Sequence, residues 1–264
     1  MRSHDAAVSG HAADLLGLAE DVARSAGELL LAGWADVADS VSTKSSRTDV
    51  VTAMDLASER HIVARIGAAR PDDGFLGEEG SDSSGSSGVR WIVDPLDGTV
   101  NYLYGLPAWA VSIGVEVDGA VVAGVVHAPV LAKTYTGCAG GPALRNGKQI
   151  KTSEVSDPGL ALFGTGFAYD AGIRAEQGRI LARVIGEIRD IRRYGSAALD
   201  LCGVADGTLD AYFERGPKEW DIAAGGFIAS LAGAVLSREG DAVAAANPAL
   251  TAWMHTAGIH PPLY

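Results

Sequence analysis

The chain has 264 residues, of which 47% are hydrophobic and 20% are charged, and its formal net charge is −12. This composition is typical of a globular protein that buries a sizeable core. The acidic balance argues against nucleic-acid binding through a basic surface, and no apolar run reaches the roughly 20 residues of a membrane span. An anionic substrate would be repelled unless bound cations inverted the local field.

The N-terminal segment and the cysteines indicate a soluble, cytoplasmic protein. The first residues, MRSHDAAVSGHAADLL, are polar and interrupted by acids, unlike a secretory signal. Cys138 and Cys202 have no metal-ligand spacing, so we expect small buried thiols in a reducing compartment.

The chain begins with two predicted helices. Apolar residues at helical spacing predict an amphipathic helix over 11–34. A polar loop follows at 36–49, and a second helix is expected from Ala53 to just before Pro71.

Strand patterns then dominate as far as about residue 135. Alternating apolar residues and an Asp-Gly hairpin signal at 118–119 predict half-buried antiparallel strands. A Ser/Gly-rich loop is expected at 81–88. The predicted strands are 74–79, 89–93, 109–117, 120–126 and one ending near Tyr135.

From about residue 159 the pattern alternates between strand and helix. The predicted elements are a strand at 160–165, helices at 173–190 and 196–205, a strand at 209–213, a helix at 220–236 and one more helix in the tail. We therefore predict one α/β (α+β) domain over 1–264, made of two packed halves. The half at 1–150 holds the helix pair and an antiparallel sheet, and the half at 151–264 is α/β, most simply giving two sheets sandwiched with helices.

The most informative stretch is WIVDPLDGT, residues 91–99. A hydrophobic strand runs into Asp94 and a proline turn, and Asp97 follows. Two carboxylates this close suit a hard cation such as magnesium. Gly98 lets the main chain approach a ligand, and the amides of Gly98 and Thr99, if they open a short helix, suit a phosphate. The alternative is an Asp-rich turn with solvated acids.

Four further acids could complete such a site, and each has a structural alternative. Glu78 and Glu79 close the strand in FLGEEG, where solvated loop glutamates are the ordinary explanation. Asp221 opens a helix, where an acid in the first turn stabilises the helix dipole. Thr52 and Asp55 match a capping box, in which Asp55 bonds back to the Thr52 amide. Capping and catalytic roles for Asp55 can coexist.

No rival chemistry stands out. The six histidines form no metal-ligand array, and the chain has no serine-hydrolase elbow, P-loop or dinucleotide-binding fingerprint.

Four patterns stand in order along the chain. They are DVVTAMD (49–55), GEE (77–79), DPLDGT (94–99) and EWDIAAG (219–225). Together they closely resemble the inositol monophosphatase family of magnesium-dependent, lithium-sensitive phosphatases, and its bacterial inositol-1-monophosphatases most closely. The resemblance runs from the first helix to about residue 240. It implies a layered α-β-α-β-α sandwich of the inositol monophosphatase and sugar phosphatase type, with the active centre between the halves, and a homodimer.

The resemblance also implies a set of Mg²⁺ ligands. Glu78, Asp94 and the carbonyl of Leu96 match the ligands of a first ion. Asp94, Asp97 and Asp221 match those of a second, with Asp94 bridging. A third, weaker ion would depend on Glu78.

Further residues match catalytic and substrate-binding positions of the family. Asp55 and Thr99 match the pair that orients the attacking water, and Glu78 assists through its metal. Lys44 matches a lysine that approaches the site, and Glu79 is a possible further site residue; a solvated loop lysine is a nearly equal alternative for Lys44. The implied substrate contacts are Asp97, Gly98, Thr99, Gly195, Ser196, Ala197, Glu214 and Asp221, with the amides of Gly98 and Thr99 on the phosphate and Glu214 on the polyol hydroxyls.

The expected activity is hydrolysis of the small-molecule phosphomonoester myo-inositol 1-phosphate, or a related inositol or sugar monophosphate, by in-line attack of a metal-activated water. Two cations can stabilise the entering and leaving oxygens of such a displacement. Histidinol phosphate, fructose 1,6-bisphosphate and nucleotide 3′-phosphates are alternative substrates. An interaction protein with secondary phosphatase activity is an alternative of another class. One departure is GPKEWD, which brings Lys218 and Glu219 near the site and can change the leaving-group pocket.

Overall fold

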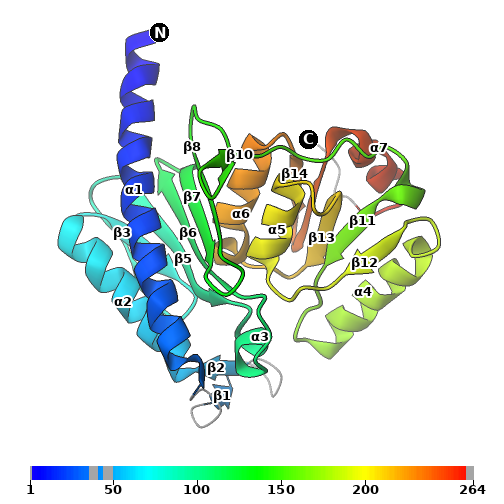
Figure 1. Ribbon diagram of the computed structural model, residues 1–264, viewed down its shortest axis with the longest axis horizontal. Coiled ribbons are helices and arrows are strands. Elements are labelled where there is room, and N and C mark those ends of the chain that lie inside the picture. Colours follow the sequence, from blue (N-terminus) through cyan, green and yellow to red (C-terminus); the bar gives the residue numbers. More distant parts are fainter. Residues whose placement is uncertain (1, 36–40, 44–49, 260–264) are drawn as a thin grey trace.

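The computed structural model describes residues 2–35, 41–43 and 50–259, and it arranges them as helix, sheet, helix, sheet and helix layers (Figure 1). The described helices are α1 (Arg2–Gly33), α2 (Ala53–Ala69), α3 (Thr99–Leu103), α4 (Ala171–Val184), α5 (Ala197–Ala205), α6 (Glu219–Leu231) and α7 (Pro248–Thr256). Helices α1 and α2 cover one sheet, α5 and α6 lie between the sheets, and α4 and α7 cover the far side of the second sheet. The predicted layered α-β-α-β-α sandwich is confirmed.

The first sheet has eight strands in the order β10-β9-β8-β7-β6-β5-β3-β4. Its strands are β3 (Gly74–Gly77), β4 (Asp82–Ser83), β5 (Val89–Asp97), β6 (Ala110–Val117), β7 (Ala120–Ala128), β8 (Lys133–Cys138), β9 (Leu144–Arg145) and β10 (Lys148–Gln149). Neighbouring strands are antiparallel except β3 and β5, which are parallel. The parallel pair places the carboxyl ends of β3 and β5, and therefore Glu78 and Asp94, at the same edge of the sheet.

The second sheet has five strands in the order β12-β11-β13-β15-β14. Its strands are β11 (Leu162–Thr165), β12 (Asp190–Arg192), β13 (Ala211–Arg215), β14 (Val235–Glu239) and β15 (Ala242–Ala246). Strand β11 is parallel to β12 and β13, while β15 is antiparallel to β13 and β14. A separate hairpin joins β1 (Val41–Thr43) to β2 (Val50–Thr52).

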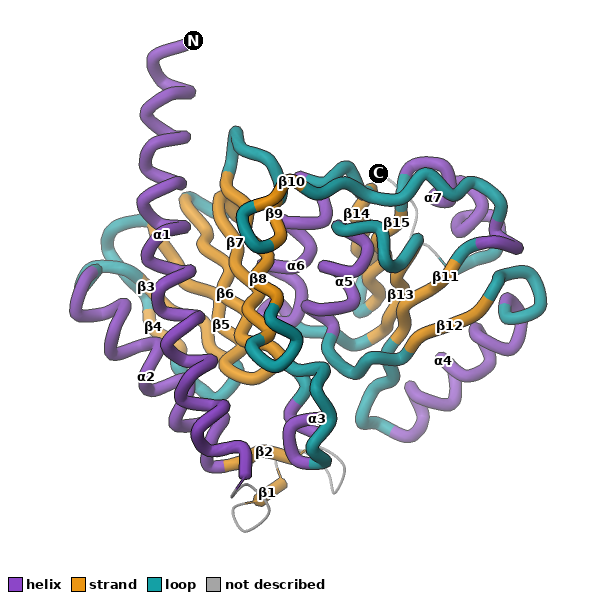
Figure 2. Tube along the Cα trace, viewed as in Figure 1, coloured by secondary structure: helices purple, strands orange, loops and turns teal. Residues whose placement is uncertain are grey.

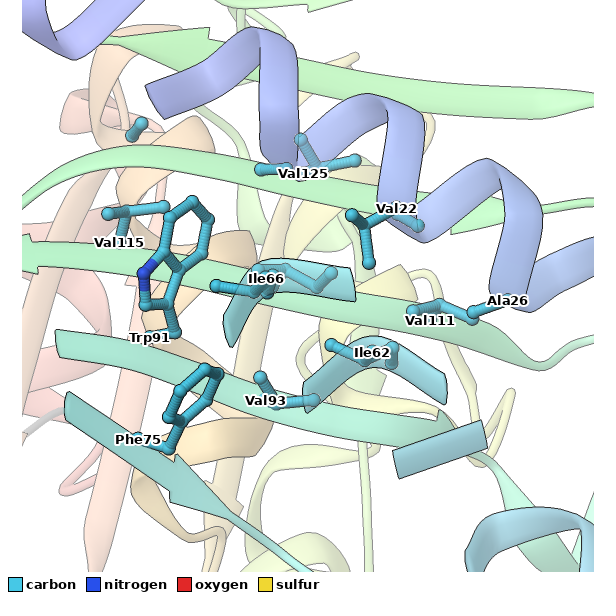
Figure 3. Packing of buried hydrophobic residues seen from close by; sticks show 14 of the residues in the cluster. Val22, Ala26, Ile62, Ile66, Phe75, Trp91, Val93, Val111, Val115 and Val125 are labelled. Carbon is cyan, nitrogen blue, oxygen red and sulfur yellow. The ribbon is translucent and has the colours of Figure 1, made fainter. Parts of the chain in front are cut away.

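The largest core cluster joins α1 and α2 to the first sheet. Val22 and Ala26 of α1 and Ile62 and Ile66 of α2 are fully buried over the valines of β5, β6 and β7 (Figure 3). Burying each large apolar side chain contributes roughly 1.5–3 kcal/mol. Trp91 of β5 lies in the same cluster, and its ring N–H is not left unpaired, because it donates to Asp73 Oδ2 at 2.9 Å.

The central helix α6 packs against the first sheet through small residues, which decides where its first turn lies. A Cβ atom added to Gly114 of β6 would be 2.9 Å from Ala223 Cβ, and one added to Gly124 of β7 would be 3.1 Å from Ala224 Cα. Glycine at these two positions therefore lets α6 pack closely on β6 and β7 of the first sheet, next to which it lies in Figure 2. This close packing carries Asp221, two residues before Ala223, toward the end of β5.

Several predicted boundaries are wrong. The helix predicted at 173–190 ends at Val184, and its last predicted position, Asp190, begins β12. The helix predicted at 220–236 ends at Leu231, because Gly233 takes φ +101° and the chain turns into β14. The hairpin of β14 and β15 was not predicted at all, since the sequence AVAAA at 242–246 has the composition of a helix.

Two predicted loops contain short strands. The loop at 81–88 includes β4, although most of it is exposed as expected. The described part of the loop at 36–49 is strand β1, which pairs with β2. Cys138 and Cys202 are both free thiols. None of the described helices combines the length and the apolar character needed to cross a membrane.

Candidate active site

A cavity of about 380 Å³ gathers most of the predicted site residues from both halves of the chain. It is bordered by the ends of β3, β5 and β13 and by the first turns of α5 and α6. The predicted residues that line it are Glu78, Asp94, Leu96, Asp97, Gly98, Thr99, Gly195, Ser196, Ala197, Glu214 and Asp221. Asp55 and Glu79 are not among the lining residues, and Lys44 lies outside the described residues.

The DPLDGT turn is held in place by contacts within itself. Asp94 is buried, and its Oδ1 accepts a hydrogen bond from the Leu96 amide at 3.0 Å. Gly98 has φ +99°, a left-handed conformation that L side chains rarely adopt, and an added Cβ would be 2.9 Å from the Ala108 carbonyl oxygen. Glycine at position 98 thus lets the chain turn sharply into α3, which begins at Thr99.

Asp55 serves the helix cap and the site at once. Its Oδ2 accepts from the Thr52 amide at 2.9 Å, which completes the predicted capping box of α2. Its Oδ1 accepts from the Thr99 hydroxyl at 2.8 Å, and Thr99 Oγ1 also lies 3.2 Å from the Leu96 carbonyl oxygen. Although Asp55 does not border the cavity, it orients the hydroxyl group that does. The predicted capping box is confirmed, and the hydrogen bond to Thr99 is compatible with the predicted catalytic role of Asp55.

The turn that presents Glu78 depends on a residue that sequence reasoning missed. Glu59 of α2 is buried, and its carboxylate accepts from the amides of Glu79 at 2.8 Å and Ser81 at 2.9 Å. Glycine at position 77 makes room for this carboxylate, since an added Cβ would be 2.5 Å from Glu59 Oε2. No local pattern marks Glu59, because its partners lie about 20 residues further along the chain.

Asp97 and Asp221 connect the first sheet to the central helices. Asp97 Oδ2 accepts from the Ser196 hydroxyl at 2.6 Å and from the Ala198 amide at 2.7 Å, which fixes the first turn of α5. Asp221 accepts from the Lys218 amide in the first turn of α6. The helix-capping alternative for Asp221 is therefore also present, alongside its place in the cavity.

The acids Glu78, Asp94, Asp97 and Asp221 lie close enough together for their negative charges to oppose ionisation of Asp94. Burial raises the pKa of Asp94 well above its usual range, and the charges of Glu78, Asp97 and Asp221 raise it further. The side chain of Glu78 is also close enough to Asp94 to favour the protonated form of its carboxyl group, which raises the pKa of Asp94 again. Burial raises the pKa of Asp97 to about 7, despite the opposing hydrogen bonds from Ser196 and Ala198. Burial likewise raises the pKa of Asp221.

Strand β13 contributes Glu214 to the lining of the cavity. Its carboxylate accepts from the Tyr212 hydroxyl at 2.6 Å, and burial raises its pKa. Gly166 of the facing segment is essential to this placement, because any Cβ atom there would collide with the Glu214 carboxylate. Arg193, Lys218 and the aromatic residues Phe167 and Tyr169 also line the cavity, and only Lys218 was anticipated.

Comparison with known proteins agrees with this arrangement. The sequence profile of the Inositol monophosphatase family matches residues 11–260. The chain belongs to this family. An inositol-1-monophosphatase SuhB of Mycobacterium tuberculosis is 47% identical over 204 residues, covering 74% of this chain and 70% of that one. A Nus factor SuhB of Pasteurella multocida is 38% identical over 224 residues, covering 84% of each chain.

Solved structures of relatives share the fold. The extragenic suppressor protein suhB of Bartonella henselae matches with a TM-score of 0.88 at 32% identity, over 92% of this chain and 98% of that one. Membership of the inositol monophosphatase family makes this chain a phosphomonoester hydrolase. The family is generally metal-dependent.

The cluster of acids in the cavity fits a metal ion in chemistry, although not yet in spacing. Every candidate ligand is oxygen, as hard divalent cations prefer. The mutual repulsion of Glu78, Asp94, Asp97 and Asp221, which raises the pKa of Asp94, is what a bound cation would relieve. As placed, no three described acidic, histidine or cysteine side chains are spaced to hold one ion. Binding would therefore draw these carboxylates together by side-chain rotation.

Divalent cations should stabilise this phosphomonoesterase more at high pH than at low pH. The pKa of Asp97 rises from 3.8 to about 7 on folding, so without cations the folded state holds more protons than the unfolded chain between these values. The free energy of unfolding therefore falls as pH rises through that window. A cation favours the ionised carboxylates, so the rise in melting temperature on adding Mg²⁺ should be larger at pH 8 than at pH 5.5.

The measurement is thermal unfolding with Mg²⁺ and with a chelator at each pH. His127, whose burial lowers its pKa to about 4, destabilises the fold toward low pH in both samples and cancels in the difference. A shift on adding Mg²⁺ that is absent, or equal at both pH values, would contradict the prediction.

Proposed function

We propose that this chain hydrolyses myo-inositol 1-phosphate, or a closely related polyol monophosphate, with Mg²⁺ as its cation. The observation that supports it is one cavity lined by two chemically different groups of residues. Glu78, Asp94, Asp97 and Asp221 form a cluster of acids, and Glu214 and the start of α5 contribute further hydrogen-bonding groups. The acid cluster suits a phosphate together with cations, and the other groups suit hydroxyl groups.

Glu78, Asp94, Asp97, Asp221 and the carbonyl of Leu96 are the proposed ligands of two cations, with Glu78 available to a third. When bound, the cations would neutralise the phosphate and lower the pKa of the attacking water. The cations would also offset the negative charge of this chain, whose net charge of −12 would otherwise repel an anionic substrate.

The residues of the chain supply position and proton control. The Thr99 hydroxyl, which donates to Asp55 Oδ1, is proposed to hold the attacking water by accepting a hydrogen bond from it. Asp55 then accepts the hydroxyl proton and keeps Thr99 in this orientation. The backbone amides of Gly98 and Thr99 are proposed to donate to phosphate oxygens, because glycine at position 98 leaves the backbone accessible.

The polyol part of the substrate is proposed to contact Glu214 and the segment Gly195, Ser196 and Ala197. Tyr212 already donates to one oxygen of Glu214, which holds this carboxylate at the cavity. Ser196 caps α5 by accepting from the Leu199 amide at 3.2 Å, so the segment before it is rigid. A rigid carboxylate and fixed backbone amides can discriminate hydroxyl positions on a ring.

The test is steady-state hydrolysis of a substrate panel with Mg²⁺ and with a chelator. The panel contains myo-inositol 1-phosphate, histidinol phosphate, fructose 1,6-bisphosphate and a nucleotide 3′-phosphate. We expect kcat/KM to be at least tenfold higher for myo-inositol 1-phosphate, and activity to vanish with the chelator and to fall with lithium. A tenfold preference for histidinol phosphate, or activity that ignores the chelator, would overturn the assignment.

A second candidate function is an interaction role with the phosphatase activity secondary to it. The relative in Pasteurella multocida that carries the name Nus factor SuhB favours this candidate. The two roles separate in an Asp94→Asn variant, because an interaction that survives the loss of phosphate release does not need the reaction.

We also propose that the chain forms a homodimer and works in the cytoplasm. The two free thiols are in keeping with a reducing compartment, and solution scattering of the purified chain tests the size of the assembly.

A further inference from the structure

Asp200, in the first turn of α5, is a buried acid that the reaction described above does not use. Its side chain is 1% exposed and borders the same cavity as Glu214. Neither of its carboxyl oxygens has a hydrogen bond or ion pair with a described residue, and Oδ1 is fully enclosed. Buried polar groups in folded proteins almost always have partners, so this one requires an explanation.

The first turn of α5 holds Asp200 in place at the cavity. Asp97 holds this turn through Ser196 and Ala198, and the Asp200 amide donates to the Ser196 carbonyl oxygen at 3.0 Å. Strand β11 passes close to the carboxyl group, since a Cβ on Gly164 would be 3.4 Å from Asp200 Oδ1.

Burial and the negative charges of Glu214 and Asp97 raise the pKa of Asp200 well above its usual range. Arg193, which also lines the cavity, opposes this shift and favours the ionised form of both Asp200 and Glu214. Glu214 and Asp200 thus form a pair of carboxyl groups with a nearby cation. Glu214 has a protein donor in Tyr212, whereas Asp200 has none among the described residues.

A purely structural acid on the same helix looks different. Asp206, at the C-terminal end of α5, is also buried, but it accepts from the Tyr135 hydroxyl at 2.8 Å and pairs with Arg145 at 2.6 Å. The partners of Asp206 offset the cost of burying it. Asp200 has no such partner among the described residues, which destabilises the folded state, and a destabilising group of this kind is typical of a binding site.

We propose that Asp200 is a specificity-determining residue whose carboxyl group receives a ring hydroxyl of the substrate. The inference rests on the proposed function and adds a second carboxyl group to Glu214 in the recognition of a polyol. The hydroxyl would donate to Oδ2, the carboxyl oxygen that is not fully enclosed, so a phosphate monoester without hydroxyl groups gains nothing from Asp200. Recognition by hydrogen bonding to a buried partner discriminates strongly against analogues that lack the group.

The test compares Asp200→Ala and Asp200→Asn with the wild-type enzyme in Mg²⁺, using myo-inositol 1-phosphate and the hydroxyl-free p-nitrophenyl phosphate. For Asp200→Ala we expect kcat/KM to fall about 10- to 100-fold with the inositol phosphate, mainly through KM, and to change less than about threefold with p-nitrophenyl phosphate. Asp200→Asn should lie between. The melting temperature of both variants should be unchanged or higher, because a buried unpaired acid has been removed.

The matched control is Asp206→Ala, which should lower the melting temperature and leave the ratio of the two substrates unchanged. The proposal is overturned if Asp200→Ala reduces both substrates equally, or if it keeps the wild-type preference for the inositol phosphate. A wild-type enzyme that cleaves p-nitrophenyl phosphate yet shows no preference for the inositol phosphate refutes the proposed substrate class, and this inference with it. The ratio of kcat/KM for the two substrates in the wild-type enzyme distinguishes a failure of the proposed substrate class from a failure of the role of Asp200.

Discussion

Asp94→Asn is expected to reduce phosphate release by about a thousandfold or more while leaving the fold intact. Asp94 is the proposed bridging ligand, and losing several kcal/mol of charge stabilisation in the transition state corresponds to a loss of this size. The substitution also removes one carboxylate from a buried group whose members raise each other's pKa. The melting temperature in chelator should therefore be equal to or above that of the wild type, and Mg²⁺ should no longer raise it.

A buried acid outside the cavity provides the control for this variant. Asp73 accepts from the Trp91 ring N–H at 2.9 Å and from Arg70 at 2.8 Å, so it supports the same strand without facing the cavity. Asp73→Asn should lower stability by about 1–3 kcal/mol and keep kcat within a few fold. Substantial turnover by Asp94→Asn, or an equal loss of turnover in both variants, would refute the role of Asp94.

Thr99→Val should lower kcat by about 10²- to 10⁴-fold, the range expected for a group that positions or transfers a proton. Valine has the shape of threonine but cannot donate to Asp55 Oδ1, which lies 2.8 Å from the Thr99 hydroxyl. The Asp55 oxygen left unpaired costs about 1–3 kcal/mol of stability. Steady-state kinetics at saturating Mg²⁺ and thermal unfolding measure the two effects separately.

Thr52→Val is the matched comparison, because Thr52 donates to the other oxygen of the same carboxylate, Asp55 Oδ2 at 2.5 Å. This variant breaks the cap of α2 and should cost about 1 kcal/mol of stability, with kcat reduced less than tenfold. Asp55→Asn combined with Thr99→Val should be no slower than the slower single variant, since the pair acts as a unit. Equal losses of kcat in Thr52→Val and Thr99→Val would show that Asp55 only caps the helix.

The acid cluster of the site could be predicted from the sequence because much of it depends on residues that are close together in the chain. In DPLDGT, the spacing of Asp94 and Asp97 and the left-handed turn at Gly98 follow from residues within a few positions of each other. The capping box of Asp55 is equally local. The parallel pairing of β3 and β5, by contrast, cannot be predicted from the sequence of either strand. This pairing places Glu78 beside Asp94.

The errors in the predicted elements also have a common cause. The pattern of 220–236 is apolar and alanine-rich, as in a buried helix, and nothing in its composition marks where the helix stops. The end is decided by the turn at Gly233 and by the antiparallel pairing of β14 and β15 with β13. Alanine-rich strands such as 242–246 exist because burial between sheet and helix layers overrides helix propensity.

The sequence by itself determined the chemistry of the acid cluster in the cavity, since oxygen ligands, a backbone turn and a capped helix are short-range properties of the chain. Only the tertiary structure decided where the residues proposed to contact the polyol lie. Glu214 needs the space left by Gly166, Asp200 needs the helix that Asp97 anchors about one hundred residues away, and Asp221 needs the close approach of α6 to the first sheet. These contacts depend on packing between distant segments, which no local pattern encodes.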